Sequence, residues 1–167
     1  MKISDQQLRA DRLIFYERDI ERLAGELDGF LELSKAKCVL LIDREGHLVT
    51  RRGESVTHAL ESLSALVAGS FAATREMATL LGEPQFSSLF HQGEHSSIQI
   101  SLVGGRTLMG IVWDDRTNLG LVRFYAQETT KRLEEVFEDM DQRNPADDPG
   151  LSSSYSQEAA AALDDLF

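Results

Sequence analysis

The sequence predicts an α+β fold in which one antiparallel sheet is covered by helices. Segments with apolar residues at three- and four-residue spacing alternate along the chain with short apolar runs of strand length. Tight-turn sequences separate the strand-like runs, and strands joined by tight turns pair antiparallel. The predicted order is helix, two strands, helix, three strands, helix, which gives one five-stranded sheet with helices packed on it.

The first predicted helix and hairpin occupy the first third of the chain. Residues 13–31 carry a single apolar stripe between charged residues, as expected for an amphipathic helix. Cys38–Asp43 is a predicted strand, and Asp-Arg-Glu-Gly at 43–46 is a tight turn in which Gly46 supplies the unusual backbone angle. A return strand at 47–51 completes the hairpin. Because the only cysteine lies in the apolar strand, no intrachain disulfide can form and we expect a buried, unreactive thiol.

The second predicted helix, residues 57–82, has two contrasting faces. It ends at Gly82, followed by Glu83 and Pro84, which is a typical C-terminal signal. On a helical projection, small or sparsely charged residues gather opposite the apolar face, and we expect this small-residue face to be a docking surface because it lets another backbone approach closely. The apolar face is Leu63, Leu66, Val67, Thr74, Met77, Ala78 and Leu81, and the small-residue face is Ala65, Ala68, Gly69, Ala72, Glu76 and Thr79.

Gly69 decides between two interpretations of this small-residue face. Alanine is a good helix former, so the alanines alone are also typical of an ordinary solvent-facing helix. A glycine inside a helix, however, costs roughly 1 kcal/mol relative to alanine and needs a compensating reason. We therefore favour the docking surface.

Three strands and a last helix are predicted in the second half. The strands are residues 86–91, Ser97–Val103 and Thr107–Trp113, and a Gly-Gly turn at 104–105 joins the last two. A helix follows over residues 119–140, although its first turns could equally continue as a strand. Its candidate buried residues are Leu121, Phe124, Leu133, Val136, Phe137 and Met140.

Composition and charge restrict the function classes. The 167 residues are enough for about one domain, or for one domain with a tail. The net charge of −11 disfavours binding to nucleic acid or to an anionic membrane surface. No apolar run approaches the roughly 20 residues of a membrane span, and the start lacks a secretion signal, so we expect a cytoplasmic protein.

The sequence shows no motif for catalysis or for cofactor binding. It lacks a phosphate-binding loop and a dinucleotide fingerprint. His91 and His95 flank a turn without a third ligand nearby, so we expect no metal site. The segment around Ser70 lacks the second glycine of a nucleophile elbow. We therefore expect no catalytic residue and no cofactor.

The chain changes character after the last predicted helix. We expect an N-terminal extension at 1–12, a folded domain at 13–140, an acidic linker at 141–154 and an amphipathic motif at 155–167. Ordering such a motif costs about 1–2 kcal/mol per residue for the backbone, more than burying its few apolar side chains returns at roughly 1.5–3 kcal/mol each. It is either a segment that folds on a partner or a frayed tail, and its motif residues are Leu163, Asp164, Asp165, Leu166 and Phe167.

Several short segments, in the order in which they occur, carry a family resemblance. They are Leu-Ser-Ala-Leu-Val-Ala-Gly-Ser-Phe-Ala-Ala at 63–73, Leu-Gly-Glu at 81–83, Phe-His-Gln-Gly at 90–93, Thr-Asn-Leu-Gly-Leu-Val-Arg at 117–123 and Leu-Asp-Asp-Leu-Phe at 163–167. Together with the element order and the first hairpin, they resemble the Roadblock/dynein-light-chain family, and more narrowly its bacterial MglB branch. The resemblance covers about residues 30–140 and the last few residues.

This resemblance implies a homodimer that regulates a small Ras-like GTPase. Two sheets would join edge to edge through the third strand, at Phe86, Leu89, Phe90 and His91, with the middle helices side by side. The helices would bind an MglA-like GTPase in its GTP form and stimulate hydrolysis, resetting a switch of cell polarity and motility. The contact would fall on the small-residue face, and the C-terminal motif would reach a second surface of the GTPase and tune nucleotide exchange.

Alternatives remain at two levels. Arg75, at the edge of the small-residue face, could act as an inserted arginine, but the resemblance implies that the regulator remodels the GTPase's own catalytic groups. The protein could also be a Roadblock scaffold without activating function, or an enzyme on a similar sheet. An enzyme would need a pocket with convergent polar groups, and the sequence shows none.

Overall fold

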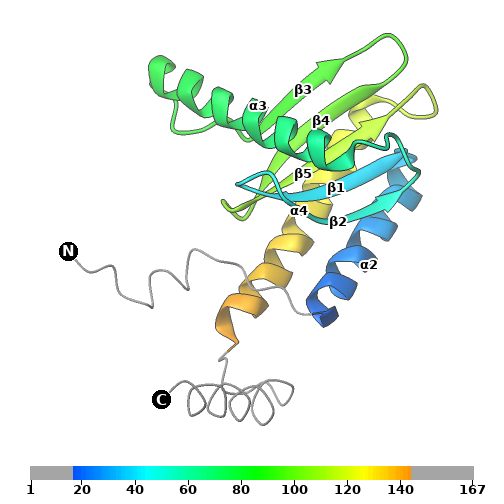
Figure 1. Ribbon diagram of the computed structural model, residues 1–167. Coiled ribbons are helices and arrows are strands. Elements are labelled where there is room, and N and C mark those ends of the chain that lie inside the picture. Colours follow the sequence, from blue (N-terminus) through cyan, green and yellow to red (C-terminus); the bar gives the residue numbers. More distant parts are fainter. Residues whose placement is uncertain (1–16, 144–167) are drawn as a thin grey trace, which may run out of the picture. The chain divides into compact units, whose positions relative to one another are not determined.

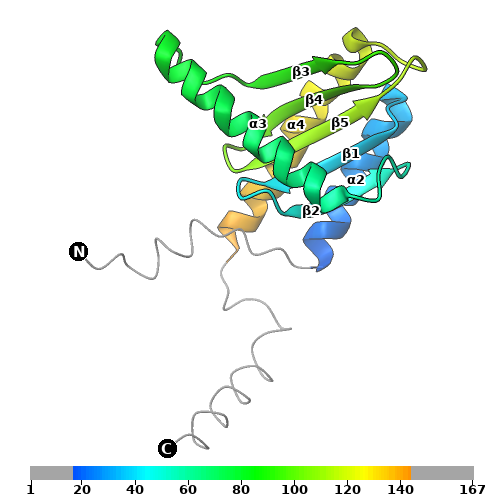
Figure 2. The ribbon, with the colours of Figure 1, turned by 45° about the horizontal axis from the view of Figure 1, so that its top comes forward.

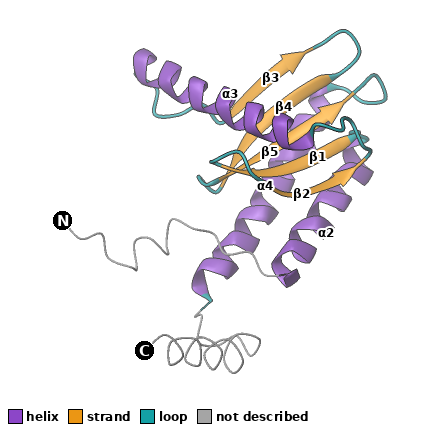
Figure 3. Ribbon diagram, in the orientation of Figure 1, coloured by secondary structure: helices purple, strands orange, loops and turns teal. Residues whose placement is uncertain are grey.

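The elements follow the predicted order. The computed structural model describes residues 17–143, and the predicted N-terminal extension, most of the linker and the C-terminal motif lie outside them. The sheet and the helices that cover it belong to one unit that ends at Phe137. The elements are α2 (Glu17–Ser34), β1 (Cys38–Asp43), β2 (Leu48–Gly53), α3 (Leu60–Leu81), β3 (Ser88–Gln92), β4 (Ser97–Val103), β5 (Thr107–Trp113) and α4 (Leu119–Gln142) (Figures 1 and 3).

The five strands form one antiparallel sheet in the order β2-β1-β5-β4-β3. The central strands are β1 and β5, while β2 and β3 are the edges. Helices α2 and α4 cover one face and α3 crosses the other (Figures 1 and 2). Of the described helices, α3 alone lies on this face, and no described strand pairs with the outer edge of β3. The opening turns of the last helix, which could have been a strand, are helical.

The core has a layer on each face of the sheet. On the α3 face, Cys38, Leu40 and Ile42 of β1 are fully buried in a cluster with Val67 and Phe71 of α3. The alternate residues of β1 point to the α2 and α4 face, as the pleat of a strand requires. Cys38 is buried, as predicted, and burial raises the pKa of its thiol, which disfavours the reactive thiolate form.

The buried stripe of α3 is centred on Phe71, which corrects two parts of the sequence projection. Ala68, predicted on the docking face, is only 8% exposed and lies in the core. Leu66, Met77 and Leu81, predicted on the buried face, are 68%, 49% and 71% exposed. The projection from hydrophobicity alone placed the centre of the buried stripe wrongly. Which residues of α3 are buried depends on which side of the helix packs on the sheet, and that side includes small residues such as Ala68.

A similar correction applies to α4. Leu133, Val136 and Phe137 are buried as predicted, but Leu121 and Phe124 are 43% and 59% exposed. The positions of this helix that face the core near its start are occupied instead by the small or branched side chains of Val122 and Ala126. In the first turns of α4, the spacing of apolar residues along the sequence therefore does not distinguish a side chain that faces solvent from one that faces the core.

The turn of the first hairpin approaches α3 closely. Gly46 has φ +94°, and the Asp43 carboxylate accepts hydrogen bonds from the backbone N–H groups of Glu45 and His47 at 3.0 and 2.9 Å. A Cβ atom on Gly46 would lie 3.0 Å from the Cα of Ala65. The chain's own fold therefore explains why two of the α3 residues are small. The backbone that approaches Ala65 and Ala68 closely is that of Gly46 in the same chain.

Two glycine-to-alanine substitutions should have opposite effects on stability. Gly46→Ala forces alanine into a left-handed conformation against the Ala65 backbone, so we expect a loss of about 1–3 kcal/mol in the free energy of unfolding. Gly69→Ala adds a Cβ atom that meets nothing within 4 Å and removes the helix penalty, so we expect a gain of about 1 kcal/mol. Urea unfolding at one protein concentration measures both. A Gly69→Ala protein less stable than wild type would contradict the open surroundings of Gly69.

Candidate protein-interaction surface

The exposed side of α3 divides into two flanks of different chemistry. One, the small flank, consists of Ala65, Gly69, Ala72, Glu76 and Thr79, all exposed. The other, the apolar flank, consists of Leu66, Met77, Leu80 and Leu81, of which Leu80 is 87% exposed. Apolar side chains this exposed, gathered on one helix, are typical of a surface that a partner covers.

The small flank keeps five of the six predicted docking residues together. Its flat part lies around Gly69, where no atom outside the helix backbone lies within 4 Å of an added Cβ. Arg75 is exposed next to this flank, and its carbonyl oxygen accepts a hydrogen bond from the Thr79 hydroxyl at 3.1 Å. The chain therefore offers a shallow surface with one acidic side chain, Glu76, and a neighbouring arginine.

An apolar groove of about 600 Å³ continues the apolar flank towards the end of β3. It lies between the first turns of α3 and the ends of the strands β3, β4 and β5. Lys37 is the one Lys, Arg, Asp or Glu in its lining. Its lining includes Leu63, Leu66, His91, Gln92, Ser96 and Ile98.

The predicted dimer strand lies at a sheet edge. Leu89, Phe90 and His91 belong to β3, whereas Phe86 precedes the strand. Among the described residues, β3 pairs with β4 and with no other strand, so its outer edge is open. Phe90 stacks on Trp113 with 5.5 Å between the ring centroids, and Leu89 packs against the α3-side core. These two side chains thus stabilise the chain's own fold, which leaves the backbone of β3 for edge pairing.

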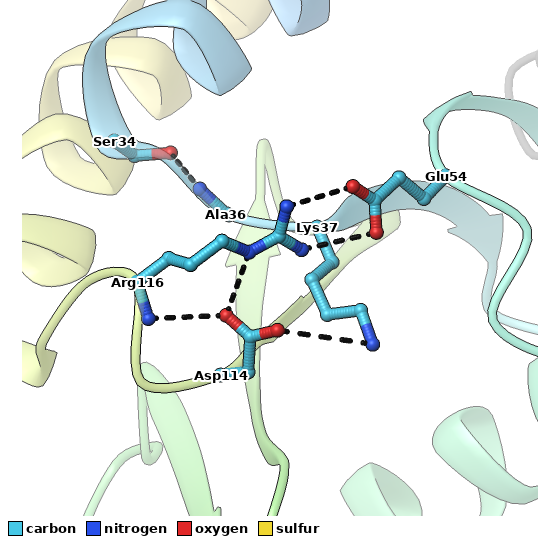
Figure 4. Close-up of polar contacts among 6 residues, drawn as sticks. All are labelled: Ser34, Ala36, Lys37, Glu54, Asp114 and Arg116. Carbon is cyan, nitrogen blue, oxygen red and sulfur yellow. Dashed lines mark hydrogen bonds and ion pairs between the residues drawn. The ribbon is translucent and has the colours of Figure 1, made fainter.

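An ion-pair cluster that sequence reasoning missed ties together the loops near the groove (Figure 4). The Arg116 guanidinium donates to both oxygens of Glu54, at 2.8 and 3.0 Å, and to Asp114 at 3.0 Å. The Lys37 Nζ atom lies 4.0 Å from Asp114 Oδ2. Arg116 follows β5 and Glu54 follows β2, so the cluster joins two loops from distant parts of the sequence. Nothing in the local sequence identifies Glu54 as the partner of Arg116.

Acid should weaken this cluster in a defined direction. Hydrogen bonds from Arg116 lower the pKa of both Glu54 and Asp114 below the ordinary values. Groups with lowered pKa values stabilise the fold above their unfolded pKa values, and that stability is lost as pH falls through their folded values, below about pH 4. We expect Arg116→Gln to be less stable than wild type at pH 7, with the difference small because the pair is half exposed, and we expect this difference to be smaller at pH 3. Urea midpoints at the two pH values measure this, and an equal difference at both would contradict it.

The first hairpin contains a group that sequence reasoning did not single out. Asp43, Glu45 and His47 place potential metal-ligand atoms within 4.8 Å of one another, all near the surface. Asp43 Oδ2 lies 3.2 Å from His47 Nδ1, while its Oδ1 stabilises the turn. The turn itself explains why these three side chains lie close together.

A search of the described helices for a membrane span finds no helix of sufficient length and apolar character.

Comparison with known proteins gives consistent relatives. A family model described as the Roadblock/LC7 domain matches residues 23–112. The solved structure of Myxococcus xanthus MglB is 32% identical and has a TM-score of 0.73, covering 79% of this chain and 99% of that one. The gliding protein MglB from Thermus thermophilus is 32% identical with a TM-score of 0.70, covering 76% and 96%. A structure of MglB with a tetrameric arrangement is 31% identical with a TM-score of 0.71, covering 77% and 96%. Comparison with proteins of curated function gives no match.

Proposed function

This chain belongs to the Roadblock/LC7 family, and on that premise we propose that it binds a small Ras-like GTPase in its GTP form and stimulates GTP hydrolysis. The observation that carries the proposal is the 32% identity with MglB over 99% of the MglB chain, which goes beyond a shared fold. The exposed small flank of α3 adds support, because it lies on the helix that the family resemblance assigns to the GTPase. The switch reset by this activity would be one of cell polarity and motility.

Self-association belongs to the same proposal. The open edge of β3 offers backbone groups for pairing with a second copy, and an unprotected edge is otherwise a risk for aggregation. A related MglB has a tetrameric arrangement, which supports self-association in this family. The regulator would therefore act as a homodimer joined through β3.

The mechanism that we propose is remodelling of the GTPase. A Ras-like GTPase hydrolyses GTP slowly until a glutamine positions the water and an arginine neutralises the transition state. A partner that binds only the conformation with these groups in place shifts the population towards it. A broad, shallow flank suits this role better than a single side chain inserted into the site. Arg75→Ala should therefore keep most of the stimulation.

Single-turnover GTP hydrolysis by a Ras-like GTPase of the same organism tests the proposal, with and without this protein. We expect stimulation by the full chain. A chain ending at residue 154 tests the C-terminal motif, for which we propose an additional contact that tunes nucleotide release. Binding without stimulation would favour a scaffold, and neither binding nor stimulation would reject the GTPase as partner. Loss of all stimulation in an Arg75→Ala protein that still binds would replace remodelling by an inserted arginine.

A further inference from the structure

A second cavity, of about 610 Å³, lies between the turn from β3 to β4, the end of β5 and the start of α4. The pleat of the strands places its aromatic wall away from α3. Leu89 and Val112 pack with the α3-side core, so their neighbours Phe90 and Trp113 point to the other face. There the two rings stack with 5.5 Å between their centroids, and both residues line the cavity. The cavity is therefore separate from the small flank of α3, the surface proposed for the GTPase.

Carboxylates outnumber cationic side chains in the lining of this cavity. The carboxylates are those of Glu94, Asp114 and Asp115, whereas Lys37 is the one Lys or Arg. Asp114 is already shared, because it accepts a hydrogen bond from Arg116 and lies near the Lys37 ammonium (Figure 4). Glu94 and Asp115 are both exposed, and Glu94 is 4.0 Å from the exposed ring of His95. These two carboxylates remain for a positively charged ligand.

A buried hydroxyl adds a further acceptor. Thr117 lines the cavity, and its Oγ1 atom is shielded from solvent without a hydrogen-bond partner in the part of the chain that the structure describes. Buried polar atoms normally have a partner, because leaving one unpaired is costly. The cavity thus combines an aromatic wall with acceptors at Glu94, Asp115 and Thr117.

An anion suits the cavity less well, although the start of α4 belongs to the lining. The N–H groups at a helix start attract anions. Here, however, the side-chain oxygen of Asn118 already accepts a hydrogen bond from the Leu121 N–H at 3.0 Å. The carboxylates of Asp114 and Asp115, a few residues before the helix, would also repel an anion.

We propose that this cavity binds a guanidinium group, carried by an arginine side chain of a partner protein or by a free alkylguanidine. A guanidinium has five N–H donors and no acceptor, which matches a lining rich in acceptors. Its planar group also packs well on aromatic rings such as that of Phe90. The site adds a ligand to the chain that the proposed GTPase regulation does not require.

Trp113 gives a direct readout of binding in the full-length protein, because it is the chain's only tryptophan. We expect N-acetyl-arginine methylamide to change the tryptophan fluorescence saturably, with half-saturation in the millimolar range. The matched control is the citrulline analogue, which has nearly the same shape without the charge and should bind at least about tenfold more weakly. Agmatine, a free alkylguanidine, is the second probe. Tighter binding of agmatine would identify a small molecule as the ligand, and tighter binding of the capped arginine would identify a protein side chain.

Asp115→Asn locates the site. Asp115 is exposed, so the fold should tolerate the change, and we expect capped-arginine binding to weaken about three- to tenfold while citrulline binding stays the same. Glu61→Gln removes the same charge from an exposed position on α3 and should bind as wild type does. Equal weakening in both variants, or citrulline binding as tight as arginine binding, would overturn the proposal. So would calorimetry that shows no binding of either guanidinium, or binding without a change at Trp113. None of these measurements uses a GTPase, so they are independent of whether hydrolysis is stimulated.

Discussion

Ala72→Arg should abolish the stimulation of GTP hydrolysis and weaken GTPase binding at least about 30-fold, the effect of a change of about 2 kcal/mol at the centre of an interface. Ala72 is exposed in the middle of the small flank. Arginine is a good helix former, so the folded chain tolerates it. A bound GTPase, in contrast, would have to bury a long cationic side chain where the helix is otherwise flat. Single-turnover hydrolysis and a titration of the GTPase in its GTP form measure the two effects.

The matched control is Gln127→Arg on α4, which adds the same side chain on the opposite layer of the fold. Gln127 is exposed, so this variant should stimulate as wild type does. Both variants should unfold at the urea concentration of wild type and keep the oligomeric state of wild type. An Ala72→Arg protein that still stimulates fully would remove the small flank from the GTPase interface. Equal loss in both variants would indicate an effect of charge alone.

Local patterns were sufficient for the order of the elements and for the exact bounds of three strands, whereas the helix ends, apart from the start of α4, differed by one to three residues where the structure describes them. Three strands were predicted with the bounds observed, because each is an apolar run with turn residues at its ends that mark where the strand stops. They are Cys38–Asp43, Ser97–Val103 and Thr107–Trp113. β2 and β3, at the two edges, were displaced by one or two residues. An edge strand has one pairing partner, and its ends depend on that register rather than on its own sequence.

The residues of the site were harder to predict, because their exposure and their neighbours depend on how α3 packs on the sheet and on which loops meet. Helical spacing placed Ala68 outside and Leu66 inside, and the sheet reverses both. The groove joins residues from before β1 to the end of β5, and the Arg116 cluster joins loops 62 residues apart. Such juxtapositions arise only after the sheet order is set. The division of the exposed side of α3 into two flanks is a property of the folded chain.

Phe71→Ala should cost about 3–5 kcal/mol in the free energy of unfolding. Phe71 is 2% exposed and lies at the centre of the stripe that fixes α3 to the sheet, in one cluster with Leu40 and Ile100. Removing the ring leaves a cavity between the helix and the strands. The start of α3 does little to offset this loss of packing, because its N-cap residue, Ala59, makes no side-chain hydrogen bond that would stabilise the helix end. Urea unfolding at a fixed protein concentration measures the loss, since a dimer's stability depends on concentration.

Leu33→Ala is the control, because it also removes a large apolar side chain but from a site that is 52% exposed on α2. We expect it to change stability by less than about 0.5 kcal/mol. The functional consequence of Phe71→Ala follows from where the ring lies. Phe71 is the largest of the buried side chains that hold α3 on the sheet, and both flanks belong to α3, so self-association and GTPase binding should fail together as the protein is warmed. If GTPase binding survived conditions in which Phe71→Ala had already lost the dimer, the two surfaces would not share the anchor, and α3 would not be the element that carries both.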